Sequence, residues 1–202
     1  TVAACDVAEA GEVAAVLRKL ERPLGAVFHL AGVLDDGLVM GLTAERLSRV
    51  LRPKVAGAWN LHHLTKGMGL SAFVLFSSFS GVTGSPGQAS YAAGNTFLDA
   101  LAGCRRNQGQ PGLSLAWGLW AQQGGGVGGG VGARGGGGMA AQLGAVGRGG
   151  MSRRGLAPMS VESGMALLDA ALGRPEATLV PVRLDVGRMQ RGLDEGGVIP
   201  GL

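Results

Sequence analysis

Short apolar runs alternate with helical patterns along most of the chain. The runs at 24–30, 73–76 and 113–117 have the length of buried strands and are bounded by turn residues. Between them, apolar residues recur at helical spacing over 10–20 and 43–64 and after Tyr91. Strands that are apolar throughout and alternate with helices indicate a parallel sheet covered on both faces, so the pattern predicts an α/β fold.

The ends of these elements are marked by recognisable residues. Thr43 is a plausible N-cap for the helical pattern over 43–64, which Pro53 is expected to interrupt. Ser160 with Ser163 predicts the start of a helix over 161–172, followed by a last strand over 177–182. Residues 1–7 are typical of the end of a buried strand.

Glycine interrupts this rhythm over residues 122–150, where about half of the residues are glycine. Because this composition is typical of flexible coil and glycine disfavours helix, we expect poor order there. The glycine tract follows a late strand and has no helical pattern directly behind it, so it does not predict a dinucleotide-binding loop. The tail over 187–202 is also glycine-rich and is predicted to be peripheral.

Composition and charge exclude several classes of protein. The net charge of +4 comes from scattered arginines without neighbouring aromatic residues, which argues against nucleic-acid binding. No apolar stretch is long enough for a membrane span. Cys5 and Cys104 are too few for a disulfide framework, and no metal-ligand spacing is present. A cytoplasmic protein is expected, and the start at Thr1 without a signal peptide is typical of a fragment or excised domain.

The candidate chemistry lies between 73 and 95. The strand ends at Ser77 and Ser78, and the helix after the loop carries Tyr91 and Asn95 on one face. Tyr91 is the single tyrosine, and a phenol can act as a general acid if a nearby ammonium lowers its pKa. Ser78 could then hold a substrate carbonyl. A half-buried tyrosine beside a turn serine is an equally good interpretation of the spacing alone.

Longer stretches carry a family resemblance. Nearly the whole chain resembles the C-terminal catalytic part of a ketoreductase domain from a modular type I polyketide synthase, within the short-chain dehydrogenase/reductase superfamily. The matching stretches are HLAGVLDDG (29–37), LRPKVAGAWNLH (51–62), FVLFSSFSGVTGSPGQASYAAGNTFLDALA (73–102), LAWGLW (115–120) and RRGLAPMS (153–160). The resemblance implies a Rossmann-like doubly wound parallel sheet without its N-terminal strands, a domain over 1–186 with a glycine-rich lid insertion at 122–150, and a tail over 187–202.

The resemblance also implies roles for four residues. Ordinary members of the superfamily have the catalytic lysine four residues after the tyrosine, where this chain has Asn95. The polyketide ketoreductases exchange the two, and Lys54 stands at the position of their lysine. Tyr91 would protonate the developing alkoxide and Ser78 would orient the carbonyl. Lys54 would lower the pKa of Tyr91 and bind the nicotinamide ribose, and Asn95 would support the proton relay.

The expected cofactor is NADPH and the expected substrate is a β-ketoacyl chain tethered to an acyl carrier protein, with other synthase domains as neighbours. By the same resemblance, Asp6 and Val7 would contact adenine, Ala31 and Gly32 would lie beside the ribose, and Gly118 would lie beside the nicotinamide. The phosphate loop and the basic residue that selects NADPH are expected upstream of Thr1.

The motif Leu34-Asp35-Asp36 marks the family class that forms the D-hydroxy product. The other class has a tryptophan where this chain has Thr83, and reductases of epimerised substrates have a proline where it has Ala93. The resemblance therefore predicts a B1-type reductase. A structural domain with a degenerate lid and a stand-alone dehydrogenase remain as alternatives, the latter disfavoured by the lysine–asparagine exchange.

Overall fold

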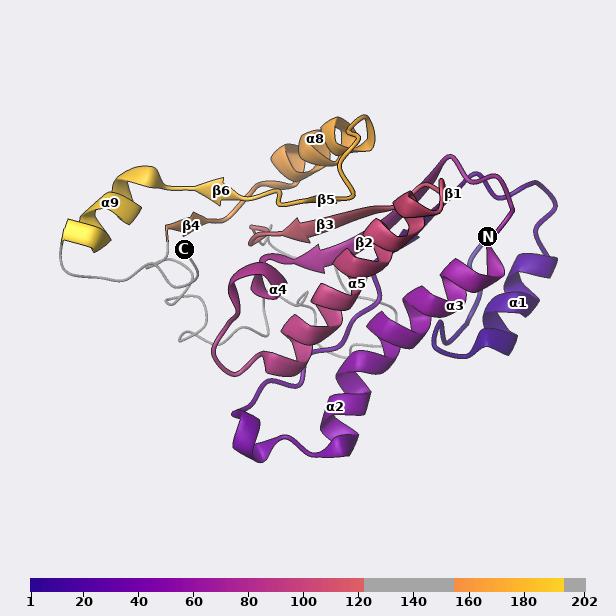
Figure 1. Cartoon of the computed structure of the whole chain (residues 1–202), viewed down its shortest axis with the longest axis horizontal. Helices are drawn as coiled ribbons and strands as arrows, with labels where there is room; N and C mark the ends of the chain where they lie inside the picture. The colour runs from indigo at the N-terminus through magenta and orange to yellow at the C-terminus, as the bar shows by residue number, and fades with distance from the viewer. Residues whose placement is uncertain (122–154, 195–202) are drawn as a thin grey trace. The chain divides into compact units, whose positions relative to one another are not determined.

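The computed structural model describes residues 1–121 and 155–194, which divide into two compact units (Figure 1). The first unit consists of residues 1–116 and 175–179. The second begins at Trp117 and, within the described residues, comprises 117–121, 155–174 and 180–194. The predicted lid insertion at 122–150 and the end of the predicted tail, 195–202, lie outside the described residues.

The sheet of the first unit confirms the strands predicted from the apolar runs. Its strand order is β1-β2-β3-β5, and the pairs β1–β2 and β3–β5 are parallel. All of β3 is buried, as expected of a strand without polar alternation. The last strand is shorter than predicted. The bounds are β1 Ala26–His29, β2 Ala72–Ser78, β3 Leu113–Trp117 and β5 Thr178–Leu179.

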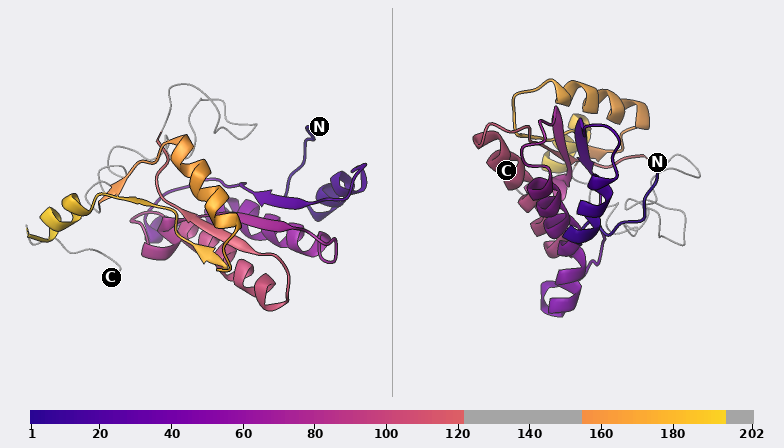
Figure 2. Two further views of the ribbon diagram at one scale, coloured as in Figure 1. Left: turned by 90° about the horizontal axis from the view of Figure 1, so that it is seen from above. Right: turned by 90° about the vertical axis from the view of Figure 1, so that its right-hand side faces the viewer.

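Five α-helices belong to this unit. Helices α3 and α5 lie on the same side of the sheet in both sets of views (Figures 1 and 2). The core forms where Leu98, Leu101 and Ala102 of α5 pack with Phe73 and Leu75 of β2. The bounds are α1 Ala10–Arg18, α2 Ala44–Leu51, α3 Gly57–Leu64, α4 Phe79–Thr83 and α5 Ala89–Asn107.

The helical run was predicted to break at Pro53 and resume after it, and instead it continues through Pro53 with a changed winding. Thr43 caps α2 as expected, accepting a hydrogen bond from the backbone of Arg46, and a short 3₁₀ turn, Val39–Gly41, precedes it. Residues Arg52–Ala56 then form a π-helical turn, η2, that leads directly into α3. A proline has no N–H to donate, and one wide turn accommodates the missing bond. Lys54 lies in this turn.

Two predictions near the ends of elements were wrong. Residues 1–6 are exposed and form no strand, because no strand of the described residues pairs with them. The segment after Ser78, predicted as a loop, begins with the short helix α4, and the Ser78 side chain caps it.

The second unit contains a small antiparallel sheet that the sequence pattern did not predict. In it, β4 (Leu156–Ala157) pairs with β6 (Arg183–Leu184). Helix α8 (Val161–Leu172) begins at the predicted Ser160 cap, and α9 (Val186–Asp194) occupies the first part of the predicted tail. Trp120 packs on Gly164, where a β-carbon would lie 2.3 Å from its ring, so Trp120 has a packing role in this unit.

Candidate active site

Helix α5 brings Tyr91 and Asn95 together as the spacing predicts. Both residues are buried, and Asn95 is fully enclosed. The Asn95 side chain donates from Nδ2 to the backbone carbonyl of Tyr91 at 2.9 Å, one turn earlier in the helix. From the end of β2, the Ser77 hydroxyl donates to the backbone carbonyl of Asn95 at 3.3 Å. The first turns of α5 are therefore tied to the carboxyl end of β2.

Lys54 reaches the same place from the π-helical turn. Its side chain is 1% exposed, and its Nζ lies 5.3 Å from the centroid of the Tyr91 ring. Nζ donates to the backbone carbonyl of Phe76 on β2 at 3.1 Å. Burial lowers the pKa of Lys54 to about 8, although the negative charge of Asp99 partly offsets the effect. Lys54 is thus a buried cation whose Nζ has one hydrogen-bond acceptor among the described residues.

Ser78 is oriented by its position at the start of α4. Its Oγ accepts from the backbone N–H of Ser80 at 3.3 Å and from the Ser80 hydroxyl at 3.0 Å. Because Ser78 accepts both of these bonds, its own proton can be directed toward the Tyr91 phenol or toward a ligand. The sequence analysis missed the role of Ser80, although a serine two residues after a candidate N-cap is a signal for such a contact.

The acidity of Tyr91 differs from the expectation. Burial raises the pKa of Tyr91, and the Asp36 carboxylate raises it further. The side chains of Asn95 and Ser78 hydrogen-bond toward the phenol and lower its pKa, but less than burial raises it. The expected lowering by Lys54 is not among these effects, because Lys54, with a pKa of about 8, loses its proton at a lower pH than the phenol does. The phenol is therefore held in its neutral, proton-donating form.

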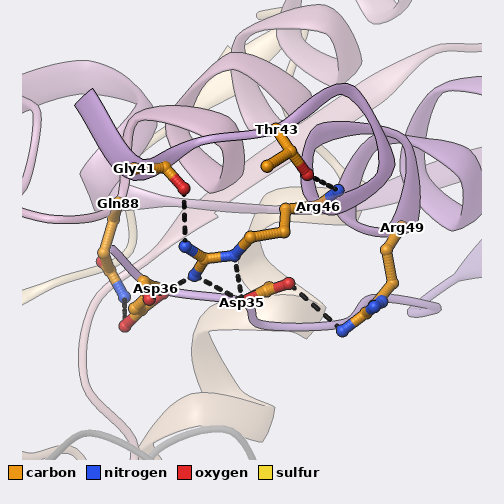
Figure 3. Close-up of polar contacts among 7 residues, drawn as sticks. All are labelled: Asp35, Asp36, Gly41, Thr43, Arg46, Arg49 and Gln88. Atoms are coloured by element: carbon orange, nitrogen blue, oxygen red, sulfur yellow. Dashed lines mark hydrogen bonds and ion pairs between the residues drawn. The ribbon is translucent and has the colours of Figure 1, made fainter. Parts of the chain in front are cut away.

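The loop that carries Leu34-Asp35-Asp36 lies against the start of α5 (Figure 3). Asp36 Oδ2 accepts from Nε2 of Gln88, the residue immediately before α5, at 2.9 Å. The backbone N–H of Gly37 donates to the carbonyl of Gly87 at 2.8 Å. Asp35 instead pairs with Arg46, which lowers the pKa of Asp35. Sequence reasoning singled out Asp35 and Asp36 but missed Gln88 and Arg46.

The predicted adenine residues contact the π-helical turn and α3. Asp6 pairs with Arg52 at 3.1 Å, and the carbonyl of Val7 accepts from Asn60 Nδ2 at 3.1 Å. Val7 also approaches the end of β1: a β-carbon on Gly57 would lie 2.8 Å from Val7 and 3.2 Å from His29.

The predicted ribose and nicotinamide residues fall in different units. Ala31 and Gly32 follow β1 by two and three residues and are half-buried. Gly118 belongs to the second unit, where its N–H donates to the carbonyl of Pro181 at 3.0 Å. The structure therefore brings together Lys54, Ser78, Tyr91 and Asn95, all within the first unit.

Comparison with known proteins supplies the family. The model of the KR domain matches residues 1–122. The chain belongs to the KR domain family of polyketide synthases. It is 49% identical over 191 residues to polyketide synthase GfsE of Streptomyces halstedii, and 47% identical over 199 residues to the spectinabilin polyketide synthase protein NorB of Streptomyces orinoci. These alignments cover 94% and 98% of this chain but only 5% and 9% of the two synthases.

Solved ketoreductases share the fold, as predicted. The structure of A-type ketoreductases from a modular polyketide synthase superposes with a TM-score of 0.80 at 38% identity, and the first ketoreductase of the tylosin synthase with 0.77 at 38%. The matches cover 94% and 98% of this chain and 37% and 39% of those chains. The Rossmann-like fold of the short-chain dehydrogenase/reductase type is thereby confirmed.

The KR family uses a nicotinamide cofactor, and the polar groups around Tyr91 fit its ribose. Asn95 Oδ1 is buried without a hydrogen-bond partner among the described residues. An ammonium has three protons to donate, and Lys54 Nζ directs one to Phe76. Leaving such capacity unused in a buried site is costly unless a ligand satisfies it. Lys54, Tyr91 and Asn95 are therefore the residues that would hold the ribose and the nicotinamide.

Within the described residues, no group of three His, Cys, Asp or Glu side chains is placed to hold a metal ion. In the same part of the chain, no helix is long and apolar enough to cross a bilayer.

Proposed function

We propose that the chain is the catalytic part of a ketoreductase domain that reduces a 3-oxoacyl group to the 3-hydroxyacyl product. The observation that carries the proposal is the buried Lys54, whose Nζ lies 5.3 Å from the ring of Tyr91, the phenol toward which Ser78 and Asn95 hydrogen-bond. A lysine buried to this degree without a carboxylate in contact is expensive to maintain for stability alone. It is well explained as part of a site that stabilises developing negative charge.

The proposed chemistry divides between two hydroxyls. Ser78 donates its proton to the substrate carbonyl and fixes its orientation. A nicotinamide dinucleotide, when bound, supplies the hydride for the carbonyl carbon. Tyr91 transfers its proton to the resulting alkoxide, so the ketone becomes an alcohol and the phenol becomes a phenolate. Lys54 stabilises the phenolate, and Asn95 holds the first turn of α5 in place.

Replacing the phenol hydroxyl tests the proposal directly. With NADPH and a β-ketoacyl thioester, the complete domain should oxidise NADPH, and Tyr91→Phe should lower kcat by about 10²–10⁴-fold, the usual contribution of general acid catalysis. The fall in NADPH absorbance and analysis of the alcohol product measure the reaction of the wild type and of the variant. Turnover that is unchanged in Tyr91→Phe rejects the assignment.

The finer parts of the proposal concern cofactor, substrate and location. We propose NADPH over NADH, and a substrate carried by an acyl carrier protein of the same synthase, with the other synthase domains as neighbours in the cytoplasm. Support comes from the similar proteins GfsE and NorB, which are polyketide synthase proteins many times longer than this chain. A comparison of kcat/KM for NADPH with NADH, and for carrier-bound with free thioester, measures both preferences.

We also propose B1-type stereochemistry, with a D-hydroxy product. The proposal rests on Leu34-Asp35-Asp36 and on the contact between Asp36 and Gln88 beside Tyr91, together with Thr83 and Ala93. The A-type designation of one similar structure is a property of that protein. Chiral chromatography of the reduced product decides the question, and an excess of the L-hydroxy product rejects the B1 assignment.

A non-reducing structural domain is the second candidate. The glycine-rich composition of residues 122–150, where the lid is predicted, favours it. It predicts that the complete domain leaves the β-keto group intact although it folds and binds its neighbours. Mass spectrometry of the carrier-bound product separates the two candidates.

A further inference from the structure

The side chain of Arg46, a residue of α2, donates hydrogen bonds to Asp35, Asp36 and Gly41 in the segment before that helix. The Thr43 cap fixes its backbone, since the Arg46 N–H donates to Thr43 Oγ1 at 3.3 Å. Its guanidinium then turns back over the preceding loop (Figure 3). Nε and Nη2 donate to the same oxygen of Asp35, Oδ1, at 3.0 and 2.6 Å. The anchor of the side chain is therefore a capped helical turn, not a flexible loop.

The same guanidinium also binds the backbone at two separated points of the loop. Nη2 donates to the carbonyl of Asp36 at 2.8 Å, and Nη1 donates to the carbonyl of Gly41 at 3.0 Å. Gly37 permits this approach, because a β-carbon there would lie 2.8 and 2.9 Å from the two terminal nitrogens. A planar, five-donor group suits such a set of acceptors, whereas an ammonium cannot reach them together.

The far side of this loop contacts the helix that carries Tyr91. Asp36 accepts from Gln88, and Gly37 donates to Gly87, just before α5 begins. Gln88 is 3% exposed, and its carbonyl accepts from the N–H of Ala92, so it is part of the first turn of α5. The chain of contacts runs from Arg46 through Asp36 and Gln88 to the turn that contains Tyr91.

An isolated surface ion pair contributes little, so the pairing with Asp35 is not by itself an argument. The side chains of Arg46 and Asp35 are 29% and 17% exposed, which makes this pair only partly accessible. The distinguishing feature is that one guanidinium joins a carboxylate and two backbone carbonyls of the loop. Arg49 provides the contrast, with one bond to Asp35 at 3.3 Å and a side chain that is 63% exposed.

From these contacts we infer that Arg46 is a positioning residue of the active site: it clamps loop 35–41 to the start of α5 and so fixes Asp36 relative to Tyr91. The inference deepens the proposed function and rests on it for its effect on the product. Without the clamp, Asp36 and Gln88 separate more often, and the wall of the site beside the Tyr91 hydroxyl becomes less well defined. The substrate can then present either face of its carbonyl.

The first test needs neither cofactor nor substrate. Because Tyr91 is the single tyrosine of the chain, absorbance near 295 nm during a pH titration reports its ionisation alone. Asp36 and burial both raise the pKa of Tyr91, with Lys54, Ser78 and Asn95 as the other groups facing the phenol. In Arg46→Met the titration should shift to lower pH, while in Arg49→Met it should match the wild type. An unchanged or raised midpoint in Arg46→Met overturns the inference.

Hydrogen exchange is the second measurement. Because it is made at neutral pH, it applies even to a variant that unfolds at the alkaline pH of the tyrosine titration. The amides of Gly37 and Ala92 should lose protection in Arg46→Met, while those of β3 should remain protected as in the wild type. Arg46→Lys keeps the positive charge but not the planar set of guanidinium donors. Its loss of protection at Gly37 should be smaller than that of Arg46→Met. Equal protection of Gly37 in the wild type and in Arg46→Met rejects the clamp.

The third measurement joins the clamp to the reaction. With a β-ketoacyl thioester, the share of the minor alcohol enantiomer should rise about tenfold in Arg46→Met, which corresponds to about 1.4 kcal/mol between the two transition states. Arg49→Met should leave the ratio unchanged. A wild-type domain that reduces nothing rejects the proposed function, and the titration and exchange results then still decide the clamp. An unchanged ratio in an active Arg46→Met variant rejects its role in positioning.

Discussion

Lys54 and Arg105 are two fully buried cations next to β2, and their hydrogen-bond partners differ. Lys54 lies near the first turn of α5, and Arg105 belongs to the last turn of that helix. Lys54 and Arg105 are each 1% exposed. Arg105 donates from Nε to the carbonyl of Pro111 at 2.7 Å and from Nη1 to His62 Nδ1 at 2.8 Å. Its guanidinium carbon also lies 3.8 Å from the centroid of the Phe73 ring. Lys54, in contrast, donates to one backbone carbonyl, that of Phe76, and faces the ring of Tyr91.

The difference separates a structural cation, Arg105, from Lys54, for which we propose a functional role. The donors of Arg105 are used to join α3, α5 and the turn before β3, and a ring face provides additional stabilisation. Within residues 1–121 and 155–194, Lys54 Nζ donates to one acceptor, and the acceptor Asn95 Oδ1 in the same site has no donor. Burial alone therefore does not mark a cation as a candidate for function, whereas unused hydrogen-bonding capacity around a buried cation does.

The largest expected effect comes from removing the functional cation. Lys54→Met should lower kcat for thioester reduction by about 10²–10⁴-fold, because the phenolate formed at Tyr91 loses its counter-charge. The free energy of unfolding should be equal or higher, because a desolvated charge is replaced by an apolar chain of similar length. Steady-state kinetics and urea denaturation of the same preparation measure both. A variant that unfolds more easily would make Lys54 a structural residue like Arg105.

Removing the structural cation should have the opposite profile. Arg105→Met leaves the Pro111 carbonyl and His62 Nδ1 without a donor, at about 1–3 kcal/mol for each buried group. The free energy of unfolding should therefore fall by several kcal/mol, while kcat of the folded fraction changes little. Arg22→Met, at an exposed position between α1 and β1, is the control and should unfold nearly as the wild type does. If Arg105→Met is as stable as this control, the satisfied contacts of Arg105 are unimportant.

The contrast between Lys54 and Arg105 also shows what sequence alone could predict. Tyr91 and Asn95 were found because helical periodicity is local, and β3 was found because its residues are apolar throughout. Lys54 was found only through family resemblance, because its contact with β2 joins segments distant in the chain. Nothing in the pattern separates Arg105 from Arg106, since the turn that buries one of them is set by tertiary structure.

Wrong predictions have a similar cause. An extended apolar segment such as residues 1–7 needs a partner strand, and the sequence cannot say whether one is present. Gln88, Ser80 and Arg46 were missed because polar residues near turns are usually solvated, and only the folded chain brings them to the start of α4 and α5. Sequence patterns predict elements well, whereas side-chain partners between elements depend on packing.

A smaller expected effect is the pH dependence that Lys54 gives to the free energy of unfolding. The pKa of Lys54 is about 8 in the folded chain, compared with an ordinary value of 10.5. Between these values the unfolded chain binds more protons, so the free energy of unfolding should rise with pH, by on the order of 3 kcal/mol in total. Lys54→Met should abolish this rise. Urea denaturation between pH 7.5 and pH 10 tests it, and a rise that persists in Lys54→Met assigns it to another group.

The smallest expected effect concerns the partner of Arg105 in acid. An arginine always donates, so the bond at 2.8 Å requires His62 Nδ1 to be unprotonated, and burial and the charge of Arg105 lower the pKa of His62. Below an ordinary histidine pKa of 6.5 the unfolded chain therefore binds more protons, and stability should fall as pH falls. Buried His29, with a pKa of about 4, contributes a further fall of the same sign.

His62→Asn separates the two histidines, because the asparagine oxygen can replace Nδ1 as the acceptor for Arg105 but does not titrate. The variant should keep most of the stability at pH 7 and lose part of the decline between pH 6.5 and pH 5, leaving the part due to His29. His63→Asn, at an exposed position on the same helix, is the control and should retain the full decline. An equal decline in both variants would mean that protonation of His62 contributes nothing to the loss of stability in acid, and the decline would then be assigned to His29 or another group.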